Sequence, residues 1–183
     1  MHVAVFSGSA LGPQSHQDAA AAVGHRMAAD GIGLVYGGGK VGLMGLVADA
    51  ALEAGGSVTG VMPQHLVDAE VAHDHLTQLY VVGTMHERKA KMVELADAFV
   101  ALPGGPGTLD ELFEVFTWAR LGLHCKPVAL LDVDAFYGPL LTQLDQMTSC
   151  GYLSSEHRAS VSVAQTVPAL MESIFAQSHT TTS

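Results

Sequence analysis

Glu111 and Arg88 have the sequence surroundings of side chains that could act on a bound ligand. Glu111 follows the segment Leu102–Thr108, which places three glycines and two prolines between two apolar runs. A tight turn needs only one glycine, so the others indicate that a ligand approaches the backbone closely. A helix that begins after such a turn directs unpaired N–H groups outward, which favours an anion such as a phosphate.

Thr108 and Glu111 also have the spacing of a capping box. In that motif the threonine accepts a hydrogen bond from the helix backbone, and the glutamate reaches back to the threonine N–H. This structural role competes with a catalytic role, because [ST]-x-x-E begins many ordinary helices. The glycine turn beside Glu111 favours the catalytic role, since a helix cap does not require such a turn.

Arg88 and Lys89 lie near the start of an expected helix, Met85–Ala96. At about 100° per residue, both cations flank the apolar face of this helix and turn partly inward. Snorkelling of the long stems is the simpler explanation. Cations at a helix N-terminus nevertheless oppose the helix dipole, and a bound anion would remove that conflict.

Short apolar runs alternate with helical stretches along the chain, which predicts β-α units around a parallel sheet. The runs are rich in valine and apolar almost throughout, as expected when helices cover both faces of the sheet. We therefore expect an α/β fold in a single domain, residues 1–177, with a disordered polar tail at 178–183. The expected strands are HVAVFSG, IGLVYGG, SVTGVMP, LTQLYVV, AFVALPGG and KPVALLD. The expected helices are Gln14–Ala29, Leu43–Ala54, Met85–Ala96, Leu109–Leu121, Ala135–Thr148 and about Thr166–Ala176, with a loop or irregular helix at Gln64–His75.

Small-residue turns follow three of the expected strands, at Ser7–Gly12, Tyr36–Gly42 and Pro103–Thr108. In a parallel sheet these strand ends emerge on one edge, where helix N-termini point their free N–H groups outward. We therefore expect the ligand crevice at that edge.

The second turn matches G-x-G-x-x-G at Gly37, Gly39 and Gly42. A dinucleotide site would also require an acidic residue at the end of the next strand, but that strand ends in Met62 and Pro63. A P-loop requires G-K-[ST], which the sequence lacks. Both nucleotide motifs are thereby disfavoured.

The composition of the 183-residue chain, 49% hydrophobic and 14% charged, is that of a compact globular protein. A formal charge of -10 disfavours nucleic acid and anionic membranes as partners. Cys125 and Cys150 form no C-x-x-C pair and no run is long enough for a signal peptide or membrane span, which predicts a cytoplasmic protein. Because His65, His73 and His75 match no standard metal spacing, we expect no metal.

The sequence resembles the LONELY GUY (LOG) family of cytokinin riboside 5'-monophosphate phosphoribohydrolases, often labelled lysine decarboxylases. The motifs that carry the resemblance are YGGGKVGLMG from Tyr36, GVMP from Gly60, MHERK from Met85, PGGPGTLDE from Pro103 and FTWARLGLHCKPVALLD from Phe116. They follow the family's order and spacing and extend over about residues 2–155.

The resemblance implies a Rossmann-like, doubly wound parallel sheet, no cofactor, and hydrolysis of the N-glycosidic bond of an N6-substituted AMP. The products would be the free base and ribose 5-phosphate, with Arg88 and Glu111 as the catalytic pair. Substrate and phosphate binding would fall to Ser7, Gly8, Gly38, Gly39, Met85, Lys89, Pro103, Gly104, Gly105, Gly107 and Thr108.

The resemblance also implies a homodimer with sites near the subunit interface. The expected helix Leu109–Leu121 agrees, since apolar side chains cover most of its circumference and require a second covering surface. The family usually has glutamine where this chain has Arg120, so contacts on the interface side, and with them the base preference, stay open.

The residues fit the implied chemistry. Cleavage of a ribosyl C–N bond develops positive charge on the sugar, which the Glu111 carboxylate can stabilise while it orients or deprotonates water. Arginine side chains stay protonated in proteins, so Arg88 is assigned to positioning and charge stabilisation. No Ser-His or Cys-His nucleophile is evident, which favours direct attack by water. The sequence does not identify the proton donor to the leaving base.

Two alternatives remain open from the sequence. A nucleotide or molybdenum-cofactor carrier would need the glycine turns but not Arg88 with Glu111. A general AMP nucleosidase would use the same pair without selectivity for the N6 group. The fold cannot distinguish these functions, so they must be distinguished by the residues of the site.

Overall fold

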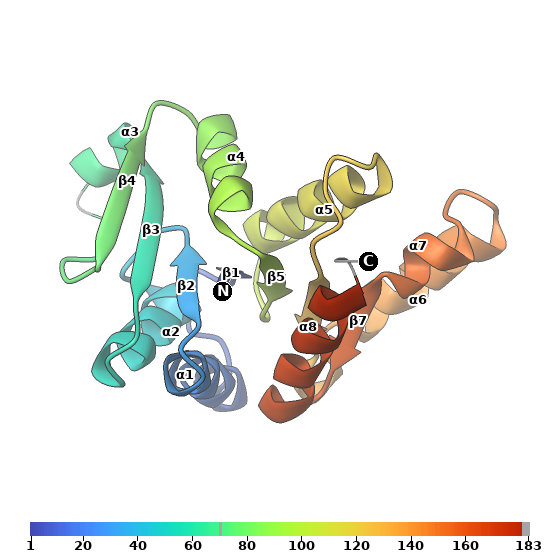
Figure 1. Ribbon diagram of the computed structural model, residues 1–183, viewed down its shortest axis with the longest axis horizontal. Coiled ribbons are helices and arrows are strands. Elements are labelled where there is room, and N and C mark those ends of the chain that lie inside the picture. The colour runs from blue at the N-terminus through green and yellow to red at the C-terminus, as the bar shows by residue number, and fades with distance from the viewer. Residues whose placement is uncertain (70, 181–183) are drawn as a thin grey trace.

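The structure, a computed structural model, describes residues 1–69 and 71–180. These residues form a seven-stranded parallel sheet in the order β4-β3-β2-β1-β5-β6-β7 (Figure 1). The predicted parallel α/β fold is confirmed, and each of the six expected strands is present. The strands are β1 His2–Phe6, β2 Gly33–Tyr36, β3 Val58–Pro63, β4 Gln78–Val82, β5 Ala98–Ala101, β6 Val128–Leu131 and β7 Val161–Ala164.

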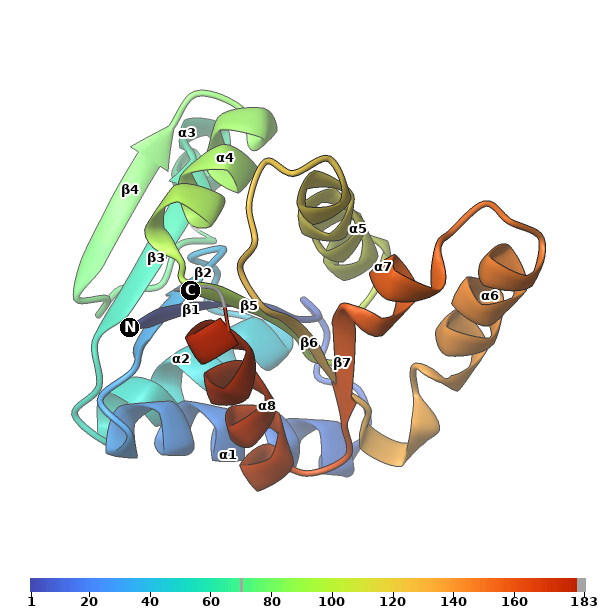
Figure 2. The same ribbon diagram turned by 45° about the vertical axis from the view of Figure 1, so that its right-hand side comes forward.

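Helices cover both faces of the sheet, with α1, α2 and α8 on one face and α4, α5 and α6 on the other (Figure 2). Side chains of β1 alternate between the two faces of the sheet. Val3 and Val5 pack in the apolar core beneath α1, α2 and α8, and Ala4 and Phe6 pack in the core beneath α4, α5 and α6. This double burial explains why the strands are apolar throughout. The helices are α1 Gln14–Ala29, α2 Gly42–Glu53, α3 Gln64–Asp68, α4 Met85–Leu95, α5 Pro106–Arg120, α6 Gly138–Ser149, α7 Ser155–Ala159 and α8 Val167–Thr180.

The direction of the chain across the sheet reverses at β1. From β1 the chain proceeds outward through β2, β3 and β4, and then returns to add β5 on the other side of β1. In open α/β sheets, ligands bind outside the carboxyl ends of the strands at such a switch point. The three glycine turns follow β1, β2 and β5, which are neighbours in the sheet.

The start of α6 differs from the prediction. We expected a helix from Ala135, but a 3-10 turn occupies Val133–Ala135 and α6 begins at Gly138. The backbone explains the difference, because Asp134 and Ala135 have φ angles of 53° and 56°. These left-handed conformations are strained for residues other than glycine and interrupt a helix.

The C-terminal part of the chain also differs. The short elements α7 and β7 were not predicted from the sequence, and β7 completes the edge of the sheet beside β6. Helix α8 continues to Thr180, into the segment that we expected to be disordered, and residues 181–183 of that segment lie outside the described residues. Gln64–His75 contains the short α3, as the expected irregular segment allowed. Among the described residues, no helix combines the length and apolar character needed to cross a membrane.

Tyr137 fixes the chain that leads into the third glycine turn. Its side chain is 1% exposed, and its hydroxyl donates to the Leu102 carbonyl at 2.6 Å. Burial, and to a smaller extent Asp132, raise the pKa of Tyr137. The hydroxyl therefore remains a donor at neutral pH.

Tyr137→Phe is expected to lower the free energy of unfolding by about 1–3 kcal/mol, because it leaves the buried Leu102 carbonyl without its donor. Urea denaturation followed by circular dichroism measures this difference. Tyr152→Phe is the matched control, since Tyr152 is 77% exposed. Equal losses in the two variants would show that the Tyr137 hydrogen bond does not stabilise the fold.

Candidate functional site

The three glycine turns contact one another directly. The Gly8 N–H donates to the Pro103 carbonyl at 3.1 Å, which joins the first turn to the third. A Cβ at Gly42 would collide with the Ser9 carbonyl, and a Cβ at Gly104 would overlap the Thr108 side chain. Several glycines of these turns are therefore required by close backbone contacts between the turns, which fix the carboxyl edge of the sheet.

The N-terminus of α2 is already occupied by protein acceptors. The N–H groups of Leu43 and Met44 donate to the carbonyls of Ala10 and Gly8, each at 3.3 Å. These donors of the second turn are therefore unavailable to an anion. Between the helices that follow the second and third turns, α5 is therefore the candidate for an anion site.

Helix α5 begins earlier than predicted, and this removes the expected capping box. Pro106 occupies the first turn, Gly105 is the N-cap, and no side chain caps the helix. Proline is favoured at this position because the missing N–H would be unpaired anyway. Thr108 is therefore a buried residue inside the first turn, 3% exposed, and Glu111 does not cap it. The first-turn N–H groups of Gly107 and Thr108 are left without intrahelical acceptors.

Glu111 instead pairs with Arg88. Arg88 Nη2 lies 3.0 Å from Glu111 Oε1, and each side chain is 11% exposed. Arg88 comes from the first turn of α4, where Thr84 Oγ1 accepts the Glu87 N–H at 3.1 Å and caps the helix. The two residues that the sequence singled out thus form one largely buried ion pair between α4 and α5.

A polar cavity of about 210 Å³ lies beside this ion pair, and we call it the Arg88 cavity. Two buried polar atoms that line it, Ser7 Oγ and Arg88 Nε, have no hydrogen-bond partner in the described part of the chain. Buried donors of this kind normally have partners, so these atoms favour a polar ligand in the cavity. The cavity is lined by Ser7, Ser9, Met44, Arg88, Glu111 and the α5 start, Gly105–Thr108.

Gly37 packs directly against the Arg88 guanidinium. A Cβ built on Gly37 would collide with Arg88 Nη2, the nitrogen that contacts Glu111. The guanidinium therefore packs against the main chain at the end of β2, where no side chain intervenes. In the sequence Gly37 stands out only as part of G-x-G-x-x-G, because its packing against Arg88 depends on a contact between distant segments.

Burial raises the pKa of Glu111 above its usual range, although Arg88 opposes this shift. Asp110 raises the pKa of Glu111 further, and Lys89 lowers it. A carboxylate with a raised pKa is a better proton acceptor, as general-base catalysis requires. Its ionised form is lost at a higher pH than that of an ordinary glutamate.

The acidic limb of the pH dependence of kcat/KM is therefore expected above the usual glutamate pKa of about 4.3, with activity falling as the pH falls. Asp110→Asn removes a negative neighbour and should move this limb to lower pH. Lys89→Gln removes a positive neighbour and should move it to higher pH. Initial rates of the hydrolysis that the sequence resemblance implies, measured across the pH range, test both shifts. If the acidic limb moved in the same direction in both variants, its assignment to Glu111 would be contradicted.

Lys89 and Met85 lie beside the Arg88 cavity rather than in its lining. Lys89 Nζ pairs with Asp110 at 3.2 Å and Glu114 at 3.0 Å, so it joins α4 to α5. Met85 is 39% exposed and places its sulfur 3.8 Å from Arg88 Nη1. Their expected roles in nucleotide binding remain predictions.

Gly38 and Gly39 pack the second turn against β3 and the segment that follows α3. Gly38 has a φ of 79° and lies against Met62, while Gly39 forms an isolated bridge with Ala72. Neither glycine lines the Arg88 cavity. His73, a member of the histidine group noted in the sequence, pairs with Asp49 at 2.8 Å.

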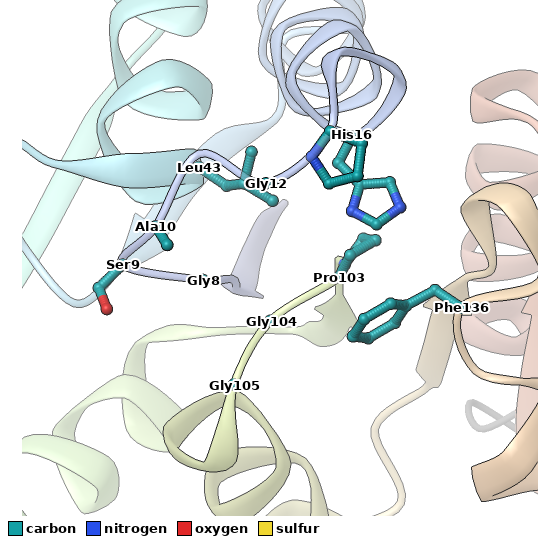
Figure 3. Close-up of a pocket in the computed structure, with 11 residues that line it drawn as sticks. Gly8, Ser9, Ala10, Gly12, His16, Leu43, Pro103, Gly104, Gly105 and Phe136 are labelled. Atoms are coloured by element: carbon teal, nitrogen blue, oxygen red, sulfur yellow. The ribbon is translucent and has the colours of Figure 1, made fainter.

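A second cavity of about 360 Å³ adjoins the first, and we call it the His16 cavity. It lies between the first and third turns, where Gly8, Pro103, Gly104 and Gly105 line it (Figure 3). Its other walls include His16 and Phe136, which sequence analysis missed. Phe136 comes from the turn before α6, and no motif in the sequence marked that turn.

The fold and the site together define a Rossmann-like α/β protein with an arginine–glutamate pair at the carboxyl edge of its sheet. The family model described as "possible lysine decarboxylase" matches residues 44–174. Cytokinin riboside 5'-monophosphate phosphoribohydrolase LOG from Oryza sativa subsp. japonica is 48% identical over 170 residues, which cover 92% of this chain and 70% of the relative. LOG2 from Arabidopsis thaliana, of the same description, is 45% identical over 93% of this chain and 80% of its own length. The chain therefore belongs to the LOG family, as its motifs predicted.

Solved structures show the same fold. The molybdenum cofactor binding protein from the phototrophic bacterium Rippkaea orientalis superposes with a TM-score of 0.72 over 96% of this chain and 94% of its own. Its sequence identity is 24%, so the likeness concerns the fold and not the ligand.

Proposed function

We propose that the protein hydrolyses the N-glycosidic bond of N6-substituted AMP, a cytokinin riboside 5'-monophosphate, to give free N6-modified adenine and ribose 5-phosphate. The observation that carries this proposal is the buried Arg88–Glu111 pair, 3.0 Å apart, beside the open N-terminus of α5. The relatives at 45–48% identity carry the name of this activity.

The Arg88 cavity supplies the groups that the reaction needs. The N–H groups of Gly107 and Thr108 bind the 5'-phosphate, and the Ser7 hydroxyl donates to it, because all three line one cavity. Glu111 then lies beside the ribose, where it takes a proton from water as the oxygen bonds to C1'. The C1'–N9 electron pair leaves with the purine, which receives the proton. Arg88 orients Glu111 and balances the charge of the phosphorylated sugar.

Selectivity distinguishes this proposal from a general AMP nucleosidase. Base release by the wild type is measured by chromatography from N6-isopentenyl-AMP, from AMP and from N6-isopentenyladenosine. Faster release from N6-isopentenyl-AMP than from both others is expected. Equal rates with AMP would favour the general nucleosidase, and equal rates with the riboside would exclude the proposed phosphate site.

A nucleotide or molybdenum-cofactor carrier is the second candidate, because its glycine turns and fold would serve a carrier equally well; the likeness to a molybdenum cofactor binding protein concerns that fold alone. A carrier would not need a buried carboxylate with a raised pKa at the ligand. Glu111 therefore favours the hydrolase.

We also propose a cytoplasmic homodimer that binds no nucleic acid and no membrane. Leu121 and Leu123, which follow α5, are each 66% exposed, and a second subunit would cover them. Both cysteines are free and exposed, which fits a reducing compartment. The net charge of -10 opposes binding to polyanions.

A further inference from the structure

We infer that the His16 cavity holds the leaving purine with its N6 substituent, and that His16 donates a hydrogen bond to that base. This inference rests on the proposed function, and it names the subsite and the donor that the sequence left unidentified. Four observations carry it: the connection between the cavities, the apolar lining, the buried His16 ring and the strained turn that presents Phe136.

The two cavities adjoin, in the order that a nucleotide requires. Ser9 and Gly105 line both of them, so a ligand can pass from one to the other across these residues. The charged groups, Arg88 and Glu111, line only the first cavity. A ribose phosphate therefore fits the polar cavity, and an uncharged base fits the second.

The lining of the His16 cavity suits a flat base that carries a hydrocarbon group. Leu43, Pro103 and Phe136 supply apolar surface, and Gly8 and Gly104 contribute backbone to the lining. At about 360 Å³, the cavity is within the size range of small-molecule sites, about 300–1,000 Å³. Its space beyond the purine is available to an N6 substituent, which an unmodified AMP would leave unfilled.

His16 is a buried polar side chain directed into this cavity. It is 7% exposed, and its ring makes no hydrogen bond with any described residue. Figure 3 shows the ring beside Phe136 and over Pro103, and its centroid lies 5.4 Å from that of Phe136 at an interplanar angle of 84°. A neutral imidazole carries one N–H donor, which can pair with a purine ring nitrogen.

The turn that carries Phe136 is held in a strained conformation. Asp134 and Ala135 have left-handed φ angles of 53° and 56°, and the Ser15 hydroxyl fixes Asp134 by a 2.5 Å hydrogen bond from α1. Strain of this kind is found at ligand clamps, where the surrounding structure maintains it. Here it presents Phe136, which lines the cavity and is 41% exposed overall. Stacking of a base on this ring would account for both the strain and the exposure.

His16 would assist cleavage of the C1'–N9 bond without entering the overall balance of electrons and protons. As the C1'–N9 bond breaks, its electron pair passes to the purine, and the His16 N–H stabilises the negative charge on the ring. Water provides the hydroxyl that bonds to C1' and the proton that the free base finally carries. Without this donor, the departing purine anion is less stabilised, so the C1'–N9 bond breaks more slowly.

The test compares wild type, Phe136→Ala, His16→Phe and His16→Gln, with Tyr152→Ala as the control for loss of an exposed aromatic ring. Calorimetric titration with N6-isopentenyladenine should show binding weakened about tenfold or more in Phe136→Ala, because the stacking surface is lost. His16→Phe should lower kcat/KM for N6-isopentenyl-AMP about 10²-fold, and His16→Gln should recover part of it through its amide N–H. Tyr152→Ala should match the wild type in both assays.

A leaving group that needs no proton separates the donor role from a packing role. With 4-nitrophenyl ribofuranoside 5'-phosphate, His16→Phe should retain nearly the wild-type rate, whereas a general packing defect would reduce it. If the wild type releases base while His16→Phe and Phe136→Ala stay within twofold of it in every assay, the inference is overturned.

The titration also decides the case in which the wild type releases no base. The proposed hydrolase function then falls, but binding of N6-isopentenyladenine that Phe136→Ala weakens would still assign the cavity to the base. Failure of the wild type to bind this base would overturn the inference as well.

Discussion

Glu111→Gln is expected to reduce kcat/KM for base release from N6-isopentenyl-AMP by about 10²–10⁴-fold, the usual contribution of a general base. Glutamine has nearly the same shape, and its carbonyl oxygen can still accept from Arg88, which lies 3.0 Å from Glu111 in the wild type. In the proposed mechanism, the variant loses the negative charge that stabilises the ribosyl cation and the group that takes the water proton. Chromatographic assay of the released base measures the loss.

Nucleotide binding provides the control for Glu111→Gln. The proposed phosphate donors are the backbone N–H groups of Gly107 and Thr108, which line the cavity and which the substitution does not alter, so the calorimetric affinity for N6-isopentenyl-AMP should change by less than the rate. A variant that binds normally and turns over at the wild-type rate would remove Glu111 from the mechanism.

Gly37→Ala is expected to reduce kcat/KM about 10²-fold although Gly37 carries no side chain. The new methyl group would collide with Arg88 Nη2, so the guanidinium must move away from Glu111. A displacement of about 1 Å in an active site can produce a loss of this size. The effect should appear in kcat/KM while the protein remains folded, because the end of the flexible Arg88 side chain can yield.

Gly138→Ala is the matched control for this substitution, because a Cβ at Gly138 meets no atom within 4 Å. It should leave kcat/KM unchanged and should not lower the thermal midpoint. Wild-type kinetics in Gly37→Ala would show that the observed position of Arg88 is not required for turnover.

The fold was predictable because its determinants are local. The valine-rich runs of β1, β2, β3 and β5 are apolar on both faces, which requires covering helices and a parallel sheet. The element β7 was missed because a short run such as VSVA gives little periodic signal, and its place beside β6 depends on tertiary contacts.

The candidate site was predictable only as a set of residue types. The sequence favoured Arg88 and Glu111 separately, but their contact depends on how α4 and α5 pack on the sheet. The capping box was wrong because Pro106 and Gly105 start α5 earlier and place Thr108 inside the first turn. Phe136 gave no signal, since its position depends on two left-handed residues that are not glycine.

The most direct test of the proposed hydrolysis is the product balance of the wild-type protein with N6-isopentenyl-AMP. Free N6-isopentenyladenine and ribose 5-phosphate are quantified by chromatography after incubation, and both should form in equal amounts over many turnovers. Recovery of intact nucleotide, together with calorimetric binding of that nucleotide, would contradict the hydrolase function and favour a carrier.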